Sequence, residues 1–367
     1  MSIQISIRMD LKEFLLDVDF SSDADRIGIL GASGSGKSLT LKSIAGVMRP
    51  GSGRIVLNGR TLFDTTGRKK IDLPPQKRRT GYLFQNYALF PSMTVRENIA
   101  CGLANRGDCQ KKTGADRKAM QAELVDGMIR RFRLGGLEKR YPSELSGGQQ
   151  QRTALARILI GEPDAILLDE PFSALDQFLR ERLQEELMEM LADYEGVLIL
   201  VSHSRDEIYR FSKEILVLDG GRCVNAGPTR QVFADPGNEA TARLTGCRNF
   251  SRAARLDEHT VRALDWGAAL HLQRAIPEDV RSIGFRDTDF VPVYGARRDN
   301  CIRFAVRRSV EMPGEKQYYL QPAECRADEG EGSALIWRVL SDGQTENAGK
   351  MPDYLQLPED KILLLTE

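Results

Sequence analysis

Residues 31–38 read Gly-Ala-Ser-Gly-Ser-Gly-Lys-Ser and match the phosphate-loop pattern G-x-x-x-x-G-K-[ST] at every fixed position. A short apolar segment at 26–30 predicts a buried strand, and residues 39–47 follow with the apolar spacing of a helix. Strand, glycine loop and helix together form an anion site, because glycines let the backbone approach phosphate oxygens and the helix N-terminus presents N–H groups. A chance glycine-rich turn is the alternative, which the flanking strand and helix disfavour.

The side chains of this loop suit a nucleotide that carries a bound cation. Lys37 can reach the β- and γ-phosphates, and the Ser38 hydroxyl can ligate Mg²⁺. The residues expected to contact the nucleotide here are Gly31, Ser33, Gly34, Ser35, Gly36, Lys37, Ser38 and Leu39.

An acidic pair follows a second apolar segment. Residues 166–168 are apolar and lead into Asp169 and Glu170. At the carboxyl end of a buried strand, Asp169 can hold Mg²⁺ and Glu170 can polarise an attacking water as a general base. A solvated acidic pair is the alternative, and the phosphate loop in the same chain makes it the weaker interpretation.

Composition narrows the possible partners. The chain has 367 residues, a length that predicts two domains, and its 52 basic and 52 acidic residues cancel. Zero net charge disfavours nucleic acid as the main partner, because nucleic-acid-binding proteins usually carry a basic excess. No apolar run approaches the ~18 residues that span a bilayer, and the N-terminus lacks a signal pattern. We therefore expect a cytoplasmic protein that reaches a membrane only through a partner.

The order of patterns predicts the fold class. Apolar segments such as 165–168 and 197–201 alternate with helical patterns, which predicts a parallel α/β sheet. A mainly helical stretch at about 86–160 interrupts this alternation. Beyond residue 235, short apolar alternations are separated by glycine, proline and charged residues, as in a small β domain. We predict an α/β domain over 1–235 with a helical subdomain, and a small β-barrel-like domain over 236–367.

Residues 145–149 read Leu-Ser-Gly-Gly-Gln and precede another helical pattern. Taken alone, this segment is a helix N-terminus capped by Ser146. In this chain it resembles the signature motif of the ABC ATPases, the nucleotide-binding subunits of ABC transporters. Gln85 resembles that family's Q-loop glutamine, residues 173–176 resemble its D-loop, and His203 resembles its switch histidine. The motifs occur in the family's order, and the resemblance covers residues 1–235.

Two positions match the family less well. Phe14 resembles the aromatic residue that stacks on adenine, in a motif that is degenerate. Leu39 stands where the family often has threonine, and no loss of function is expected because it follows the metal-binding position. For His203, a satisfied core histidine is the alternative to the switch role.

The resemblance implies a P-loop NTPase fold, ATP and Mg²⁺ as cofactors, and ATP hydrolysis as the activity. Two copies would pair head to tail, with each phosphate loop facing the signature segment of the other copy. Catalytic roles are implied for Gln85, Glu170 and His203, and metal binding for Ser38, Gln85 and Asp169. Further nucleotide contacts are implied for Phe14, Ser146, Gly147, Gly148, Gln149 and Asp176. A scaffold that binds ATP without turnover is the alternative, which an intact Glu170 and His203 disfavour.

Residues 86–95 resemble the importer form of the family, in which this segment helps to build a groove for a coupling helix of the membrane subunit. Local core packing is the alternative. DNA-repair relatives separate their ATPase halves by long coiled coils, and translation-type members usually carry two cassettes, neither of which this sequence shows. The resemblance therefore implies an importer subunit on the cytoplasmic side of the cell membrane. Its partners would be integral membrane permease subunits and, indirectly, a substrate-binding protein.

The cargo is inferred from analogy alone. Residues 53–60, 72–82, 245–250 and 276–286 resemble ATPases of molybdate importers and their sulfate-importing relatives. The resemblance implies uptake of an oxyanion such as molybdate, with sulfate, iron and polyamine importers and non-transport ABC ATPases as alternatives. For the C-terminal domain it implies an oligomer-binding-like module that either senses an oxyanion or stabilises a dimer.

Overall fold

The computed structural model describes residues 1–106, 113–172, 177–324, 334–340 and 350–366. The chain divides into two units, Met1–Arg230 and Gln231–Glu367. The sequence predicts domain limits of 1–235 and 236–367 and a helical subdomain. This division does not test them, so they stay predictions.

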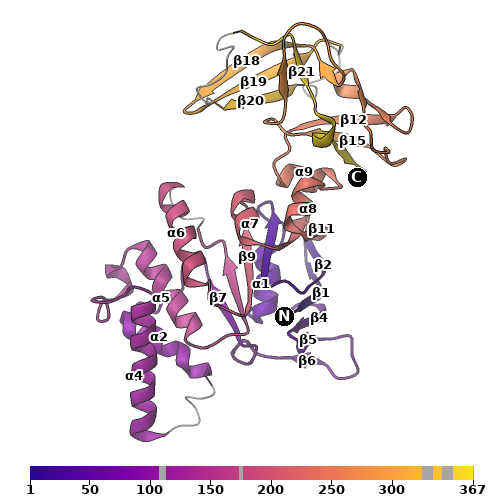
Figure 1. Ribbon diagram of the computed structural model, residues 1–367. Coiled ribbons are helices and arrows are strands. Elements are labelled where there is room, and N and C mark those ends of the chain that lie inside the picture. Colours follow the sequence, from indigo (N-terminus) through magenta and orange to yellow (C-terminus); the bar gives the residue numbers. More distant parts are fainter. Residues whose placement is uncertain (107–112, 173–176, 325–333, 341–349, 367) are drawn as a thin grey trace. The chain divides into compact units, whose positions relative to one another are not determined.

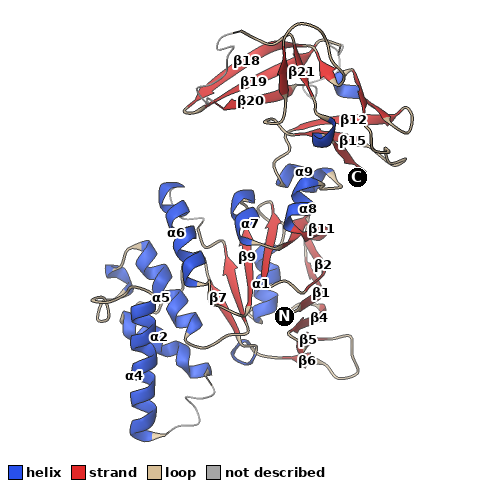
Figure 2. Ribbon diagram, viewed as in Figure 1, coloured by secondary structure: helices blue, strands red, loops and turns tan. Residues whose placement is uncertain are grey.

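Within the described residues, one mixed sheet of 11 strands frames the first unit, in the order β6-β5-β4-β1-β2-β11-β10-β3-β9-β8-β7 (Figure 2). Five strands are parallel to one another: β10 (Glu214–Asp219), β3 (Arg26–Gly31), β9 (Val197–Ser202), β8 (Ala165–Asp169) and β7 (Thr80–Leu83). The others are β1 (Ile3–Leu11), β2 (Phe14–Ser22), β4 (Ser52–Leu57), β5 (Arg60–Asp64), β6 (Ile71–Asp72) and β11 (Arg222–Pro228). The parallel core confirms the α/β fold that the alternating patterns predict.

Helices connect the parallel strands. Helix α1 (Lys37–Ala45) follows β3, α6 (Gln177–Met190) lies between β8 and β9, and α7 (Arg205–Phe211) lies between β9 and β10. Helices α2 (Val95–Cys101), α4 (Gly114–Arg131) and α5 (Gly147–Leu159) lie together between β7 and β8 in the chain (Figure 1). No helix in the described ranges is both long and apolar enough to cross a membrane.

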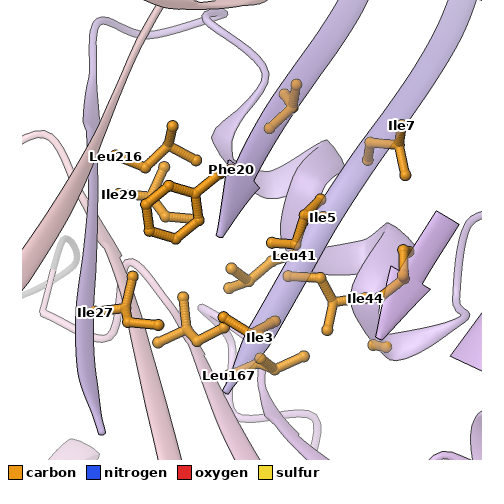
Figure 3. Close-up of a cluster of buried hydrophobic side chains, with 14 of the residues drawn as sticks. Ile3, Ile5, Ile7, Phe20, Ile27, Ile29, Leu41, Ile44, Leu167 and Leu216 are labelled. Carbon is orange, nitrogen blue, oxygen red and sulfur yellow. The ribbon is translucent and has the colours of Figure 1, made fainter. Parts of the chain in front are cut away.

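A buried core fixes α1 against the sheet (Figure 3). Leu41 and Ile44 of α1 lie among Ile3, Ile5 and Leu167, and all five are almost inaccessible to solvent. Strand β1 supplies its isoleucines by strict alternation, since successive side chains of a strand point to opposite faces. Burying each such side chain contributes about 1.5–3 kcal/mol, so α1 has a fixed position relative to the strand ends.

A buried arginine from another segment caps the C-terminal end of α1. The Arg78 side chain is 1% exposed, and its Nη1 donates to the carbonyl oxygens of Ser43 (2.7 Å) and Ile44 (3.0 Å). Its Nε donates to the carbonyl of Leu73 at 2.7 Å. Gly46 follows the helix at φ +76°, and a Cβ there would clash with the guanidinium. Arg78 therefore satisfies the last carbonyls of α1, where the helix macrodipole is negative.

The second unit is rich in strands, as predicted, and its strands pair in antiparallel fashion. In its described part they form three sheets, ordered β14-β13-β12-β15-β22, β16-β21-β17 and β18-β19-β20. Leu270, Leu320 and Leu355, one from each sheet, lie in one buried cluster. The strands are β12 (Asn249–Arg255), β13 (Thr260–Ala263), β14 (Ala268–His271), β15 (Ser282–Phe285), β16 (Val291–Val293), β17 (Cys301–Ile302), β18 (Phe304–Met312), β19 (Glu315–Pro322), β20 (Leu335–Leu340), β21 (Tyr354–Gln356) and β22 (Leu363–Leu365). Helix α9 (Glu239–Leu244) precedes β12, and α8 (Thr229–Ala234) spans the division between the units.

Arg78→Met should lower the free energy of unfolding of the first unit by about 3 kcal/mol, because buried carbonyls at the end of α1 lose a charged donor. Far-UV circular dichroism during urea unfolding measures the change. Arg79→Met is the matched control, because Arg79 is 56% exposed and pairs with Asp164 at the surface. Equal midpoints for the two variants would contradict the role of Arg78.

Tryptophan fluorescence gives an internal check on that experiment. The chain has 2 tryptophans, Trp266 and Trp337, and both lie in the core of the second unit. Their unfolding transition should stay unchanged in Arg78→Met, because the substitution removes contacts in the first unit only.

Candidate functional site

The phosphate loop connects β3 to α1 in a conformation that suits an anion. Gly34 (φ +81°) and Gly36 (φ +98°) adopt left-handed backbone angles that favour glycine. A Cβ on Gly36 would also clash with the Leu16 side chain. Gly36 is the N-cap of α1, and no side chain caps the helix. The N–H groups of the first helical turn therefore remain available to an anion.

Lys37 lies inside this loop. Its side chain is 5% exposed, and Nζ donates to the carbonyl oxygens of Gly31 (2.9 Å) and Ala32 (2.8 Å). Burial lowers the pKa of this ammonium below its ordinary value, and the charges of Glu170 and Asp169 oppose that shift. The loop thus holds a cation at the place where phosphate oxygens are expected.

The Ser35 hydroxyl is a buried polar group of the same loop. Among the residues that the structure describes, it has no hydrogen-bond partner. Leaving a buried hydroxyl unpaired costs free energy, so an oxygen ligand such as phosphate suits this position.

Asp169 ends β8 beside the first turn of α1. Its Oδ1 accepts a hydrogen bond from Ser38 Oγ at 2.7 Å, and its Oδ2 accepts one from the Tyr82 hydroxyl at 2.6 Å. The oxygens of Ser38 and Asp169 are the ligand type that Mg²⁺ prefers, so this pair fits a magnesium site. Burial, together with the bond to Asp169, raises the pKa of the Tyr82 phenol, which therefore stays protonated as a donor.

Glu170 has an unusual backbone conformation. Its φ of +45° lies in the left-handed region that residues other than glycine rarely adopt. Its N–H donates to the carbonyl of Val201 at 3.0 Å, which ties this residue to β9. The carboxylate is 3.9 Å from Lys37 Nζ and 3.3 Å from His203 Nδ1. The structure therefore brings three of the predicted residues, Lys37, Glu170 and His203, together.

A hydrogen-bonded turn holds His203 at the end of β9. Ser202 Oγ donates to the buried Glu207 carboxylate at 2.6 Å and accepts from Ser204 N–H at 2.9 Å. Gln184 of α6 donates to the other oxygen of Glu207 at 3.0 Å. The His203 side chain is 51% exposed, so it lies at the surface and not in the core.

The signature segment begins a different helix. Ser146 is the N-cap of α5, and it forms a capping box with Gln149. Gln150 Nε2 donates to the carbonyls of Pro142 and Leu145, which fixes the approach to the helix. A Cβ on Gly148 would lie 3.2 Å from the Leu183 side chain of α6. Ser146 and Gly147 are exposed, so this helix start is open to a second molecule.

The remaining predicted residues lie outside the phosphate loop. The Phe14 ring packs beside Gly36 and Gly221 at the start of β2. Leu39 packs partly against the buried core, and Gln85 is exposed after β7. Asp176 lies outside the described residues.

Two residues with clear structural roles, Tyr82 and Glu207, were not among the sequence-based candidates. Tyr82 lies in a strand whose pattern predicts core packing, and Glu207 lies in a helix where an acid is ordinarily solvated. A polar group on an otherwise buried face would indicate such a role, because buried polar groups need partners. That burial is known only once the neighbouring elements are placed.

Sequence comparison identifies relatives over most of the chain. The family model described as ABC transporter matches residues 16–173. A molybdate/tungstate import ATP-binding protein of Thermococcus kodakarensis is 38% identical over 315 residues, which cover 84% of this chain and 89% of that protein. An Fe(3+) ions import ATP-binding protein of Haemophilus influenzae is 36% identical over 250 residues, which cover 68% of each protein.

A solved structure shares the fold of the nucleotide-binding part. It is described as a dimeric post-hydrolysis state of the ATP-binding cassette MJ0796 bound to ADP and Pi. It matches with a TM-score of 0.51 at 25% identity, and the match covers 63% of this chain and 99% of that chain. This chain therefore belongs to the ATP-binding proteins of ABC transporters, and it is an ATPase.

Proposed function

We propose that this chain is the ATP-hydrolysing subunit of an ABC importer and energises uptake of an oxyanion such as molybdate through separate membrane subunits. The length of one match supports this cargo. The molybdate/tungstate relative aligns over 315 residues, more than the first unit, Met1–Arg230, contains. The alignment with the iron relative is shorter, at 250 residues or 68% of this chain. Uptake of iron, sulfate or polyamines is the alternative.

The two helix N-termini support a composite ATP site. The phosphate loop leads into the uncapped start of α1, and at the start of α5 the capping box of Ser146 and Gln149 leaves the N–H groups of Gly147 and Gly148 outside it. We propose that two copies pair head to tail, so that ATP lies between the loop of one copy and the signature segment of the other. Asp176 would lie at the same interface, and Phe14 would stack on adenine.

Charge and geometry support the roles within one copy. Lys37 and the Ser35 hydroxyl would bind phosphate oxygens, and Glu170 would accept a proton from the attacking water. His203, 3.3 Å from Glu170, would orient that carboxylate. Gln85 would contact the cation and the water. Phosphoryl transfer depends on positioning and charge stabilisation more than on covalent chemistry, and these residues provide both.

The magnesium part of the proposal depends on Ser38 and Asp169. Mg²⁺, when bound, neutralises charge on the β- and γ-phosphates. Ser38 would offer its hydroxyl oxygen, and Asp169 would hold that hydroxyl and water around the cation. The 2.7 Å hydrogen bond between them already places both oxygens together.

Glu170→Gln should lower ATP turnover by about 100-fold or more and preserve ATP binding, because an amide of the same size cannot accept the proton. Phosphate release measures turnover, and titration with a fluorescent ATP analogue measures binding. Glu162→Gln is the control, because Glu162 also has a left-handed backbone (φ +48°) but forms a surface pair with Arg106. Turnover of the Glu170 variant within a few fold of the unmutated protein would remove Glu170 as the base.

Mixing two inactive variants tests the composite site. Lys37→Ala and Ser146→Glu should each abolish most activity, and a mixture should recover part of it. In mixed dimers, one site combines an intact Lys37 from one copy with an intact Ser146 from the other. Lys37→Ala mixed with the double variant Lys37→Ala/Ser146→Glu is the control and should stay inactive. Mixed dimers that form without recovering activity would contradict head-to-tail pairing.

Reconstitution with the membrane subunits tests the importer function and its cargo. The ATPase is purified together with its membrane partners and assayed with binding proteins loaded with molybdate, tungstate, sulfate, iron or spermidine. Stimulation by molybdate or tungstate alone is the expected result. Stimulation by a different cargo would replace the oxyanion assignment and keep the ATPase function.

A further inference from the structure

Tyr82 contacts the proposed metal site from a neighbouring strand. It lies in β7, which pairs with β8 so that Tyr82 is opposite Leu167, two residues before Asp169. Its ring packs against Phe84, with the centroids 4.3 Å apart, and against the buried core of the first unit. The phenol is therefore held by apolar contacts while its hydroxyl reaches Asp169 Oδ2 at 2.6 Å.

The two oxygens of Asp169 have separate partners. Ser38 Oγ donates to Oδ1, and the Tyr82 hydroxyl donates to Oδ2. A hydroxyl has one proton and two lone pairs, so Ser38 can continue to donate to Asp169 while a lone pair faces a cation. The final torsion of an aspartate is broad, so a carboxylate held at one oxygen only could rotate. The bond to Tyr82 prevents that rotation.

We infer that Tyr82 is a positioning residue of the magnesium site, whose hydroxyl fixes the Asp169 carboxylate so that Ser38 and Asp169 present their oxygens together. This inference rests on the proposed binding of Mg²⁺ with ATP. Partners of metal-ligating carboxylates commonly set metal affinity, by about 10–100-fold. A purely structural tyrosine would affect folding or nucleotide binding irrespective of the metal.

Tyr82→Phe in the full-length protein separates these roles. Affinity for a fluorescent ATP analogue is measured with Mg²⁺ and with EDTA, and the ratio gives the contribution of the metal. We expect this ratio to fall by about 10-fold in Tyr82→Phe, with the affinity in EDTA within twofold of the unmutated protein. Tyr194→Phe is the matched control, because it removes another tyrosine hydroxyl, bonded to the Pro163 carbonyl at 2.9 Å, and should keep the ratio.

A double-mutant cycle tests whether Tyr82 acts through Asp169. In an Asp169→Asn background, Tyr82→Phe should change the ratio by less than twofold, because the carboxylate it orients is gone. Thermal unfolding of each variant establishes that it is folded, and Tyr82→Met is the second variant with an apolar side chain.

Three results would overturn the inference. An unchanged ratio in Tyr82→Phe would show that Tyr82 does not support the metal. An equal loss of affinity with Mg²⁺ and with EDTA would assign Tyr82 to the fold of the nucleotide site. An unmutated protein that binds the analogue equally well with and without Mg²⁺ would overturn the proposed metal site itself, a failure distinct from the other two.

Discussion

The proposed nucleotide site depends on helix α1, whose C-terminal end is satisfied by a side chain and whose N-terminal end is not. At the C-terminal end the buried Arg78 guanidinium satisfies the carbonyls of Ser43 and Ile44. At the N-terminal end no side chain caps the first turn. A capping side chain would stabilise the helix by about 1 kcal/mol but would occupy one of the N–H groups that are available to an anion. The core contacts of Leu41 hold the helix in place, so its open end faces the edge where β3, β8 and β9 finish.

Charge at this edge favours the proposed cation. Lys37 lies 3.9 Å from Glu170, and Asp169 also acts on its charge. A triphosphate brought to the loop adds negative charge next to two carboxylates, which is unfavourable without compensation. The single positive charge of Lys37 cannot balance the negative charges of the triphosphate and the two carboxylates. A divalent cation held by Ser38 and Asp169 would restore the balance. The left-handed backbone of Glu170 keeps its carboxylate in this position at a local cost of about 1–3 kcal/mol.

The sequence predicts the parts of the site that depend on local spacing. Three short patterns each determine a local backbone conformation. They are the phosphate loop, the acidic pair at the end of β8, and the Ser146 cap with Gln149 three residues later. Contacts between distant side chains could not be predicted in this way. Tyr82 and Asp169 are 87 positions apart, and a tyrosine in a strand is ordinarily a core residue. Similarly, nothing local distinguishes buried Arg78 from exposed Arg79, because burial depends on the carbonyls of α1, which lie far away in the sequence.

The two units carry different kinds of information about function. The groups around the phosphate loop are proposed to serve ATP, a role that would be the same for every cargo, so similarity there does not identify a cargo. The second unit has its own buried core, including Trp266 and Trp337, which is separate from the core that holds α1. Sequence similarity that persists through such a unit is therefore less constrained by ATP chemistry. For this reason, the 315-residue match supports the proposed oxyanion cargo more strongly than sequence identity within the first unit does.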